Sequence, residues 1–298
     1  MQIPQPVDSS IEVIRHLLGH SGCRVALCRR GDVYFVRKFS ASEAYNERLQ
    51  SQLSKQERLS EMIRTPRIIE QGLQDGLIYF DMEFINGHSF GSYAPLQNVA
   101  TLSDFARRIL EPVRALAENR SGTISAATFR TKVESVSRAV AASAFYPSHR
   151  AILDRALASL DQADWSDIPC TASHGDLTLE NMLVTEEGEI VLIDLLDGDL
   201  ETVWLDVAKL LQDLESGWSL RGVLWKAELS ANDRLMAMLS RYLYDEIRSQ
   251  ILVMFPQLAP KLSQLRVLQA MRVLPYVHDE ITFRHVVRGL DRALVAGR

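Results

Sequence analysis

The chain has 298 residues, of which 33 are Lys or Arg and 38 are Asp or Glu, and 47% of its residues are hydrophobic. This composition is that of an ordinary globular protein, and at this length we expect two unequal lobes. The net charge of −5 lacks the basic excess with which proteins bind phosphate backbones, so we expect no nucleic-acid partner.

The cysteine spacing, the amino terminus and the length of the apolar runs indicate where the protein is located and whether it has a membrane partner. Three cysteines without a CxxC pair argue against a disulfide framework and a structural zinc site, which favours a cytoplasmic location. The amino terminus does not resemble a secretory signal, and no run of about 18 apolar residues is present, so we expect no membrane partner. The oligomeric state is left open.

The first 85 residues predict a small sheet with one long helix. Apolar residues at helical spacing predict a short helix over 10–18. β-rich runs around Gly-containing turns predict two hairpins, with strands over 24–28, 33–39, 68–69 and 77–85. The segment 41–64 contains no Gly or Pro and predicts a long amphipathic helix.

The remaining chain is predicted to be mainly helical. Residues 101–163 show helical patterns interrupted near Gly122 and Pro147. A second β-rich patch predicts a hairpin with strands over 182–184 and 190–193. From Trp204 onward the pattern is again helical, with breaks at Gly217 and at three prolines.

The densest polar constellation is His174-Gly175-Asp176, followed by Asn181 and later by Asp194. Phosphoryl transfer requires one carboxylate that orients the attacking hydroxyl, together with oxygen ligands that hold Mg²⁺ against nucleotide phosphates. An Asp followed by an Asn five residues later has the spacing of a kinase catalytic loop. The alternative is a polar turn at Asp176 with a solvated Asp194.

Upstream residues offer the groups that would bind a nucleotide. Period-2 alternation places Val36 and Lys38 on one face of a strand, where a lysine can reach phosphates and a small apolar residue can lie against a base. Among the glutamates of the long helix, Glu57 is preferred as the partner of Lys38, with Glu47 as the substitute. The segment 19–22 could contact phosphates through its backbone, although it is not a GxGxxG motif.

These motifs resemble the aminoglycoside phosphotransferase and choline kinase family, and the resemblance covers most of the chain. It implies an α+β, bilobal, protein-kinase-like fold, with a β-rich nucleotide-binding lobe over 1–84 and a larger, mainly helical lobe over 85–298. The site would lie in the cleft between the lobes. The HGD sequence, where protein kinases have HRD, favours a small-molecule acceptor over a protein.

The resemblance also implies roles for individual residues. Asp176 would be the catalytic base, His174 would support the loop, and Asn181 and Asp194 would bind Mg²⁺. Lys38 would contact the phosphates of ATP or GTP. The base would lie behind Met82, with the Glu83 carbonyl and the Ile85 N–H as its hydrogen-bond partners, and Asp206 would brace the catalytic loop.

Two other functions compete with this interpretation. Gly87-His88-Ser89-Phe90-Gly91 satisfies the GxSxG pattern of serine hydrolases, although Ser92 to Pro95 are predicted to form a loop where a nucleophile elbow requires a helix. A catalytically silent kinase-like module that binds nucleotide is the other alternative.

The acceptor is predicted to be a small molecule that carries a hydroxyl group. The carboxylates that follow the catalytic motifs would favour a cationic or polyhydroxylated compound, such as a sugar, an amino-alcohol or an aminoglycoside, if they formed an acidic wall. They are Asp197, Asp199, Glu201, Asp213 and Glu215. The same residues could equally be solvated turn and helix charges.

Overall fold

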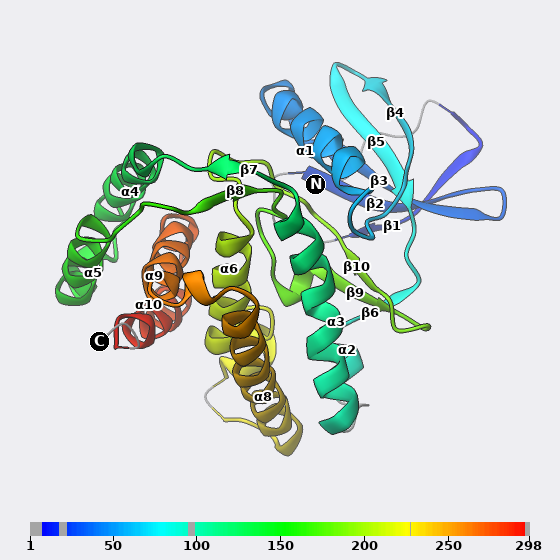
Figure 1. Ribbon diagram of the computed structural model, residues 1–298. Helices are drawn as coiled ribbons and strands as arrows, with labels where there is room; N and C mark the ends of the chain where they lie inside the picture. The colour runs from blue at the N-terminus through cyan, green and yellow to red at the C-terminus, as the bar shows by residue number, and fades with distance from the viewer. Residues whose placement is uncertain (1–7, 18–22, 95–98, 227, 296–298) are drawn as a thin grey trace. The chain divides into compact units, whose positions relative to one another are not determined.

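The computed structural model describes residues 8–17, 23–94, 99–226 and 228–295. The chain divides into two compact units, one formed by residues 1–88 with 182–197 and the other by residues 89–181 with 198–298. The boundary expected at residue 84 lies close to the first division, whereas the hairpin within 182–197 groups with the first unit. Figure 1 shows the elements in chain order.

The first unit is built on an antiparallel five-stranded sheet with the order β1-β2-β3-β5-β4. Its strands are β1 (Ile11–Leu17), β2 (Cys23–Arg30), β3 (Val33–Ser40), β4 (Ile68–Gln74) and β5 (Leu77–Glu83). The expected long helix is shorter than predicted, because a 3-10 turn (Glu43–Tyr45) precedes α1 (Asn46–Leu59). The turn between β4 and β5 has positive φ at Asp75 and Gly76, as the Asp-Gly pair predicts for a two-residue hairpin.

The prediction of a helix over 10–18 is wrong, because the described part of this segment forms β1. The register shifts between Val13 and Arg15, so a bulge interrupts the two-residue alternation and produces apolar spacing that resembles a helical pattern. Pairing with β2 and the β-branched residues of this segment favour the strand.

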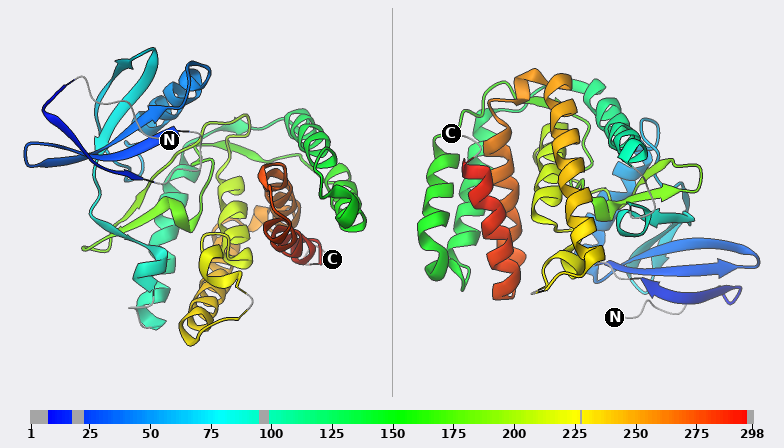
Figure 2. Two further views of the ribbon diagram at one scale, coloured as in Figure 1. Left: turned by 180° about the vertical axis from the view of Figure 1, so that it is seen from behind. Right: turned by 90° about the horizontal axis from the view of Figure 1, so that it is seen from below.

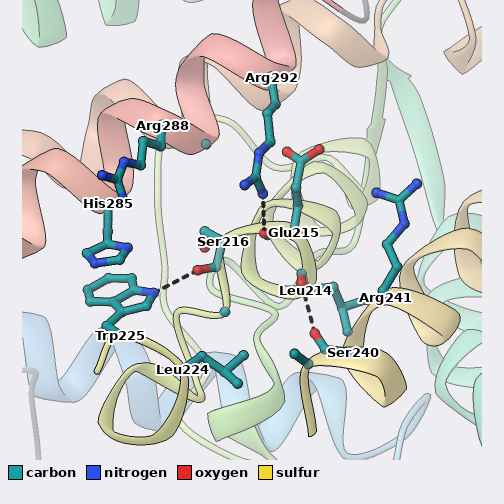
Figure 3. Close-up of a pocket in the computed structure, with 13 residues that line it drawn as sticks. Leu214, Glu215, Ser216, Leu224, Trp225, Ser240, Arg241, His285, Arg288 and Arg292 are labelled. Carbon is teal, nitrogen blue, oxygen red and sulfur yellow. Dashed lines mark hydrogen bonds between the residues drawn. The ribbon is translucent and has the colours of Figure 1, made fainter. Parts of the chain in front are cut away.

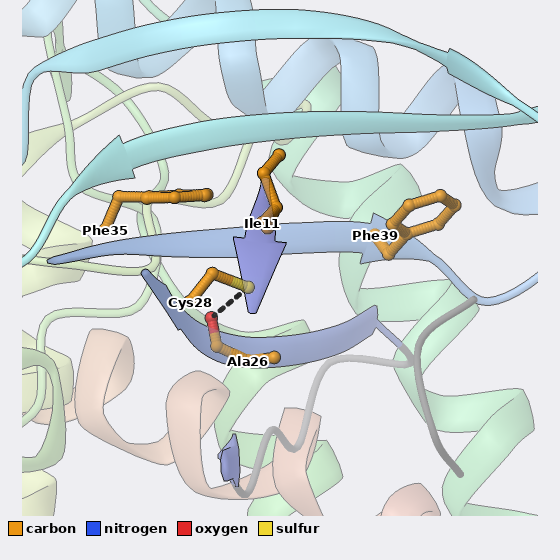
Figure 4. Packing of buried hydrophobic residues seen from close by; sticks show 5 residues of the cluster. All are labelled: Ile11, Ala26, Cys28, Phe35 and Phe39. Atoms are coloured by element: carbon orange, nitrogen blue, oxygen red, sulfur yellow. Dashed lines mark hydrogen bonds between the residues drawn. The ribbon is translucent and has the colours of Figure 1, made fainter. Parts of the chain in front are cut away.

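Apolar residues cover both faces of this sheet. On one face Ile11, Ala26, Cys28, Phe35 and Phe39 form a buried cluster (Figure 4). On the other face Leu49 and Leu53 of α1 pack against Phe80 of β5. Alternate residues of β3 and β5 therefore point into two different packed layers.

A smaller sheet completes the first unit. Its strands are in the order β10-β9-β6, with β6 (Gly87–Ser89), β9 (Met182–Thr185) and β10 (Ile190–Leu192). The predicted hairpin over 182–193 is thus confirmed. The backbone N–H of Leu192 donates to the carbonyl oxygen of Arg64 at 2.9 Å, which joins the hairpin to the segment that follows α1.

The second unit is mainly helical (Figures 1 and 2). Its helices are α2 (Phe90–Tyr93), α3 (Val99–Glu118), α4 (Ala126–Ala141), α5 (Tyr146–Asp161), α6 (Val203–Ser216), α7 (Arg221–Leu224), α8 (Ala231–Met254), α9 (Leu262–Val273) and α10 (Glu280–Val295). The short pair β7 (Arg120–Thr123) and β8 (Pro169–Thr171) was not predicted. In the part of the chain that the structure describes, no helix has the length and apolar content needed to cross a membrane.

Helix α6 lies at the centre of this unit. It packs against α3, α8, α9 and α10, and every residue from 203 to 214 is buried. Thr202 caps its amino terminus by accepting a hydrogen bond from the Trp204 N–H, and Gly217 ends it in a left-handed conformation. A helix buried on all sides fixes the position of any polar side chain that it carries.

Candidate active site

Strand β3 of the first unit places Lys38 next to Asp194. The lysine Nζ donates to Asp194 Oδ1 at 2.5 Å and to Gln52 Oε1 at 2.9 Å. Lys38 is buried, whereas the Asp194 side chain is 31% exposed. Asp194 has a φ of 59°, which is uncommon for a residue other than glycine. The unit thus holds an accessible carboxylate beside a buried ammonium group.

The helix partner of Lys38 is Gln52, and the preference for Glu57 is wrong. Glu57 is exposed, while Gln52 and Leu53 lie on the buried face of α1. The five residues from 52 to 57 correspond to an angle of about 140° around a helix with 3.6 residues per turn. An amide therefore occupies the position where we expected a carboxylate, so Lys38 has Asp194 as its charged partner.

Arg37 and the adjacent residues of β5 support this arrangement from the opposite face. Arg37 and Asp81 form a buried bidentate pair with distances of 2.6 and 2.8 Å. Burial raises the pKa of Asp81, while its hydrogen bonds to Arg37 act in the opposite direction. The pair anchors β3 to β5 immediately next to Lys38.

The residues expected around a nucleotide base lie together at one end of the same sheet. Val36 pairs with Met82 across β3 and β5, and β5 ends at Glu83. The Glu83 carboxylate accepts hydrogen bonds from Arg64 at 2.7 and 2.9 Å, and these bonds lower its pKa. Ile85 follows and is buried. The expected phosphate-contacting segment 19–22 lies outside the described residues.

In the second unit, Asp206 holds the HGD loop from the first turn of α6. Its buried carboxylate accepts hydrogen bonds from the backbone N–H groups of His174 at 2.6 Å and Gly175 at 2.8 Å. Gly175 has a φ of 92°, which a residue with a Cβ rarely adopts, so glycine suits this position. The His174 side chain is fully buried and its Nδ1 accepts from the Asp176 N–H at 3.3 Å. The His174 ring therefore contacts the backbone of its own loop.

Asp176 projects from this loop with 34% of its side chain exposed. Asn181 Nδ2 donates to the Asp176 backbone oxygen at 2.9 Å and to its Oδ2 at 3.3 Å. Lys209 of α6 lies 3.5 Å from Asp176 Oδ1, and its side chain is only 10% exposed. A fixed amide and a buried cation thus orient a carboxylate that solvent can reach.

Three charged residues of α6 form the base of the catalytic loop. Asp206, Lys209 and Asp213 follow one another at spacings of three and four residues, and therefore share one face of the helix. Asp213 is buried and accepts from the Leu179 N–H at 2.7 Å and from the N–H and hydroxyl of Ser219 at 2.7 and 2.6 Å. Burial raises the pKa of Asp213. Sequence reasoning did not identify Lys209 or this role of Asp213, although charges at helical spacing in an otherwise apolar helix were the available signal.

The five carboxylates that we considered as an acidic wall are divided between the two units. Asp213 is buried under the loop, and Glu215 pairs with buried Arg266. Glu201 accepts a hydrogen bond from Ser173, and Asp199 lies 3.5 Å from Lys132. Asp197 belongs to the first unit, where it accepts from Ser51. Each of these carboxylates therefore has a partner in its own unit.

Ser89 lacks the geometry of a hydrolase nucleophile. The expectation of a loop from Ser92 is wrong in part, because α2 follows Ser89 directly. However, Ser89 has an ordinary extended backbone with φ −67° and ψ 159°, and its hydroxyl lies 3.1 Å from the hydroxyl of Ser92. A nucleophile elbow requires a strained turn and a histidine base. The Ser89 backbone is not strained, and within the described ranges its hydroxyl contacts Ser92 and no histidine.

Oxygen ligands for a metal ion are available in both units. The hydrogen bonds of Asn181 within the described chain use its Nδ2 group, so its side-chain oxygen is available as a ligand. The Asp194 carboxylate is accessible and uses one oxygen for Lys38. Carboxylate and amide oxygens suit Mg²⁺. The described residues contain no group of three or more His, Cys, Asp or Glu side chains in a metal-binding arrangement.

A cavity of about 320 Å³ lies elsewhere in the second unit, between the carboxyl-terminal end of α6 and helices α7, α8 and α10 (Figure 3). Trp225 and His285 stack in parallel there, with ring centroids 4.5 Å apart. Trp225 Nε1 donates to the backbone carbonyl oxygen of Ser216, and Arg292 Nη1 donates to the backbone carbonyl oxygen of Glu215. Glu215, which we considered for the acidic wall, lines this cavity, but none of the residues predicted for catalysis, nucleotide binding or metal binding does, so we do not assign the chemistry to it.

The two units together contain the parts of a phosphotransferase: a sheet lysine paired with an aspartate, and a braced HGD loop with its asparagine. A family model described as the phosphotransferase enzyme family matches residues 14–239, which is well over half of the chain. The chain belongs to this family and is a phosphotransferase that acts on hydroxyl groups. A search among curated proteins finds no significant match.

Solved structures share the fold over nearly the whole chain. A thermostable mutant of aminoglycoside phosphotransferase APH(4)-Ia, in ternary complex with ADP and hygromycin B, matches with a TM-score of 0.62 and 15% identity, covering 96% of this chain and 95% of that chain. ADP-bound aminoglycoside phosphotransferase APH(2'')-Ib matches with a TM-score of 0.56 and 12% identity, covering 97% and 95%.

A putative fructosamine-3-kinase from Haemophilus somnus 129PT also matches, with a TM-score of 0.52 and 11% identity, covering 94% of this chain and 92% of that chain. At these identities the similarity shows the fold, which is protein-kinase-like.

Proposed function

We propose that this protein is a Mg²⁺-dependent kinase that transfers the γ-phosphate of ATP to a hydroxyl group of a small molecule. The observation that carries the proposal is the environment of Asp176. Its accessible carboxylate is fixed by Asn181 and Lys209, on a loop that buried Asp206 holds through two backbone N–H groups. A polar turn without function would not need this buried support, because burying charged groups is costly.

In the proposed reaction Asp176 accepts the proton of the acceptor hydroxyl as its oxygen attacks the γ-phosphorus in line. The bond between that phosphorus and the bridging oxygen of ADP breaks. Lys209 and Asn181 keep the Asp176 carboxylate in one orientation while the proton moves. His174 and Asp206 contribute by fixing the backbone of the loop.

The first unit binds the nucleotide in this proposal. Lys38 contacts the phosphates, Val36 and Met82 lie against the base, and the Glu83 carbonyl and the Ile85 N–H form hydrogen bonds with it. Support comes from the position of Lys38 and Val36 on the face of β3 opposite to Arg37, and from the pairing of Val36 with Met82. The fold relatives that were crystallised with ADP favour ATP over GTP.

Asn181 and Asp194 are the residues that would hold Mg²⁺. When bound, the ion would neutralise negative charge on the nucleotide phosphates. Within this chain, Lys38 holds Asp194 through one carboxylate oxygen, and the hydrogen bonds from Asn181 to Asp176 hold the asparagine side chain. Both ligands are thus oriented by other residues of their own unit.

Phosphoryl transfer from radiolabelled ATP to a panel of hydroxyl compounds tests the proposal. We expect Asp176→Asn to lose at least 1,000-fold in kcat, on the order expected for a catalytic base whose loss also misorients the acceptor, and to retain nucleotide binding. Asp245→Asn, which changes an exposed carboxylate of α8, is the matched control and should behave as wild type. Equal transfer by Asp176→Asn and wild type would contradict the assignment.

The two alternatives give different results in the same experiment. A silent module would bind ATP without transfer to any acceptor or to water. A serine hydrolase would cleave ester substrates without nucleotide and lose that activity in Ser89→Ala.

A further inference from the structure

Arg272 of α9 lies beside the catalytic loop and is held there by buried polar contacts. Its Nη1 donates to Gln269 Oε1 at 3.0 Å, and Gln269 Nε2 donates to the backbone oxygen of Leu205 at 2.8 Å. Leu205 precedes Asp206, which holds the backbone of His174 and Gly175. The guanidinium group is therefore positioned against the same helix turn that supports the loop.

The charges around Arg272 leave it without a carboxylate partner. Asp176 pairs with Lys209, Asp199 pairs with Lys132, and Asp206 accepts two backbone N–H groups. Within the described ranges Arg272 forms its hydrogen bond with Gln269 and no ion pair. Burial lowers the pKa of this guanidinium, and Asp176, Asp206 and Asp199 partly offset the effect. A partly buried cation without an ionic partner is costly unless a ligand compensates it.

Arg266, on the same helix, is an arginine whose charge is compensated within the protein. It is buried, pairs with the Glu215 carboxylate and lies over the ring of Tyr244 at 5.6 Å. Among the described residues, Arg272 lacks the carboxylate partner that Arg266, six residues earlier on the same helix, has.

We propose that Arg272 binds an anionic group of the phosphate acceptor, so that the preferred acceptors are hydroxylated acids, such as sugar acids or sugar phosphates, and not aminoglycoside-like cations. The inference rests on the proposed kinase function. A guanidinium group presents paired N–H donors that match a carboxylate or a phosphate. Binding the acid group would place a hydroxyl of the same molecule near Asp176, and Arg272 would act as a specificity-determining residue.

The acceptor can be tested with glucose, glucuronate and glucosamine, three sugars that differ in charge. We expect wild type to phosphorylate glucuronate with a kcat/KM at least about tenfold above that for glucose, and glucosamine least well. In Arg272→Gln the ratio of glucuronate to glucose should fall close to one. Preference of the wild type for glucosamine, or an unchanged ratio in Arg272→Gln, would overturn the proposal.

The anionic group that Arg272 binds could instead be the phosphoryl group that is transferred from ATP. ATP hydrolysis without an acceptor separates the two sources, because water carries no anionic group. If Arg272→Gln loses hydrolysis as severely as it loses transfer to glucuronate, the guanidinium acts on the phosphoryl group and the acceptor assignment is wrong. If the wild type shows no Mg²⁺-dependent binding of ATP, the proposed function itself fails, which distinguishes the two failures.

Two measurements of thermal stability apply even if none of the three sugars is an acceptor. With Mg²⁺ and ADP present, sulfate should raise the Tm of wild type more than that of Arg272→Gln, and equal shifts would contradict the proposal. Without ligands, Arg266→Gln should lower the Tm by several degrees and Arg272→Gln by much less. A loss in Arg272→Gln as large as that in Arg266→Gln would make Arg272 a structural residue.

Discussion

Asp213→Asn tests the buried frame beneath the catalytic loop. Asp213 Oδ1 accepts from the Ser219 N–H, and Oδ2 accepts from the Leu179 N–H and the Ser219 hydroxyl. An asparagine keeps one acceptor oxygen and replaces the other with an NH₂ group. This NH₂ group is a donor, and it faces a backbone N–H, which is also a donor. One buried N–H is then left unsatisfied, at a cost of about 1–3 kcal/mol, and the other two hydrogen bonds each lose about 1 kcal/mol with the charge.

The removal of a buried charge returns part of this cost, so we expect a net loss of about 2–4 kcal/mol in the free energy of unfolding. For a chain of 298 residues, a loss near 3 kcal/mol corresponds to a fall in Tm of about 5 °C. Thermal and urea unfolding monitored by circular dichroism would measure it. The conservative control is Asp199→Asn, whose side chain is 79% exposed and whose effect should stay within about 0.5 kcal/mol. Equal effects of the two substitutions would refute the reasoning.

Further predictions concern the other buried charges and the thiols. Lys209→Met should lower kcat by about 10- to 100-fold because Asp176 loses its orientation, and steady-state kinetics should show partial rescue by Lys209→Arg; an unchanged kcat would exclude this role. Arg37→Met should cost about 3–5 kcal/mol in urea unfolding by leaving Asp81 buried without a partner, and adding Asp81→Leu should restore most of the loss. Burial raises the pKa of Cys28 to about 11, so at pH 8 a thiol reagent should modify the partly exposed Cys170 first. Because unfolded Cys28 loses its proton near pH 9 and folded Cys28 near pH 11, native stability should fall as the pH rises between these values.

Much of the fold follows from local sequence patterns. The Asp-Gly turn between β4 and β5 and the hairpin of β9 and β10 are set by their own turn residues, and each was predicted. Segment 11–17 was assigned wrongly because a bulge disturbs its alternation, and pairing with β2 decides its structure. β7 and β8 were missed because their pairing joins segments about 50 residues apart.

The catalytic motif could be predicted because its residues are close together in the chain, whereas the residues that support it are not. Gln52 takes the place of the expected Glu57, since the face of α1 that packs on the sheet decides which side chain reaches Lys38. Lys209 and Asp213 contact loop residues that lie more than 30 positions earlier. The sequence shows that these residues are charged. Only the burial of α6 shows that their charged groups lie away from solvent and therefore need hydrogen-bond or ionic partners within the protein.

Nucleotide binding tests the central claim most directly. The Tm of the purified protein should be measured without ligand, with ATP, with GTP, and with each nucleotide together with Mg²⁺, because a ligand that binds only the native state must raise it. We expect a Mg²⁺-dependent increase with ATP that is lost in Asp194→Ala and retained in Asp176→Asn. The absence of any increase in the wild type, or an equal increase in Asp194→Ala, would contradict the assignment of this protein as a Mg²⁺-dependent kinase.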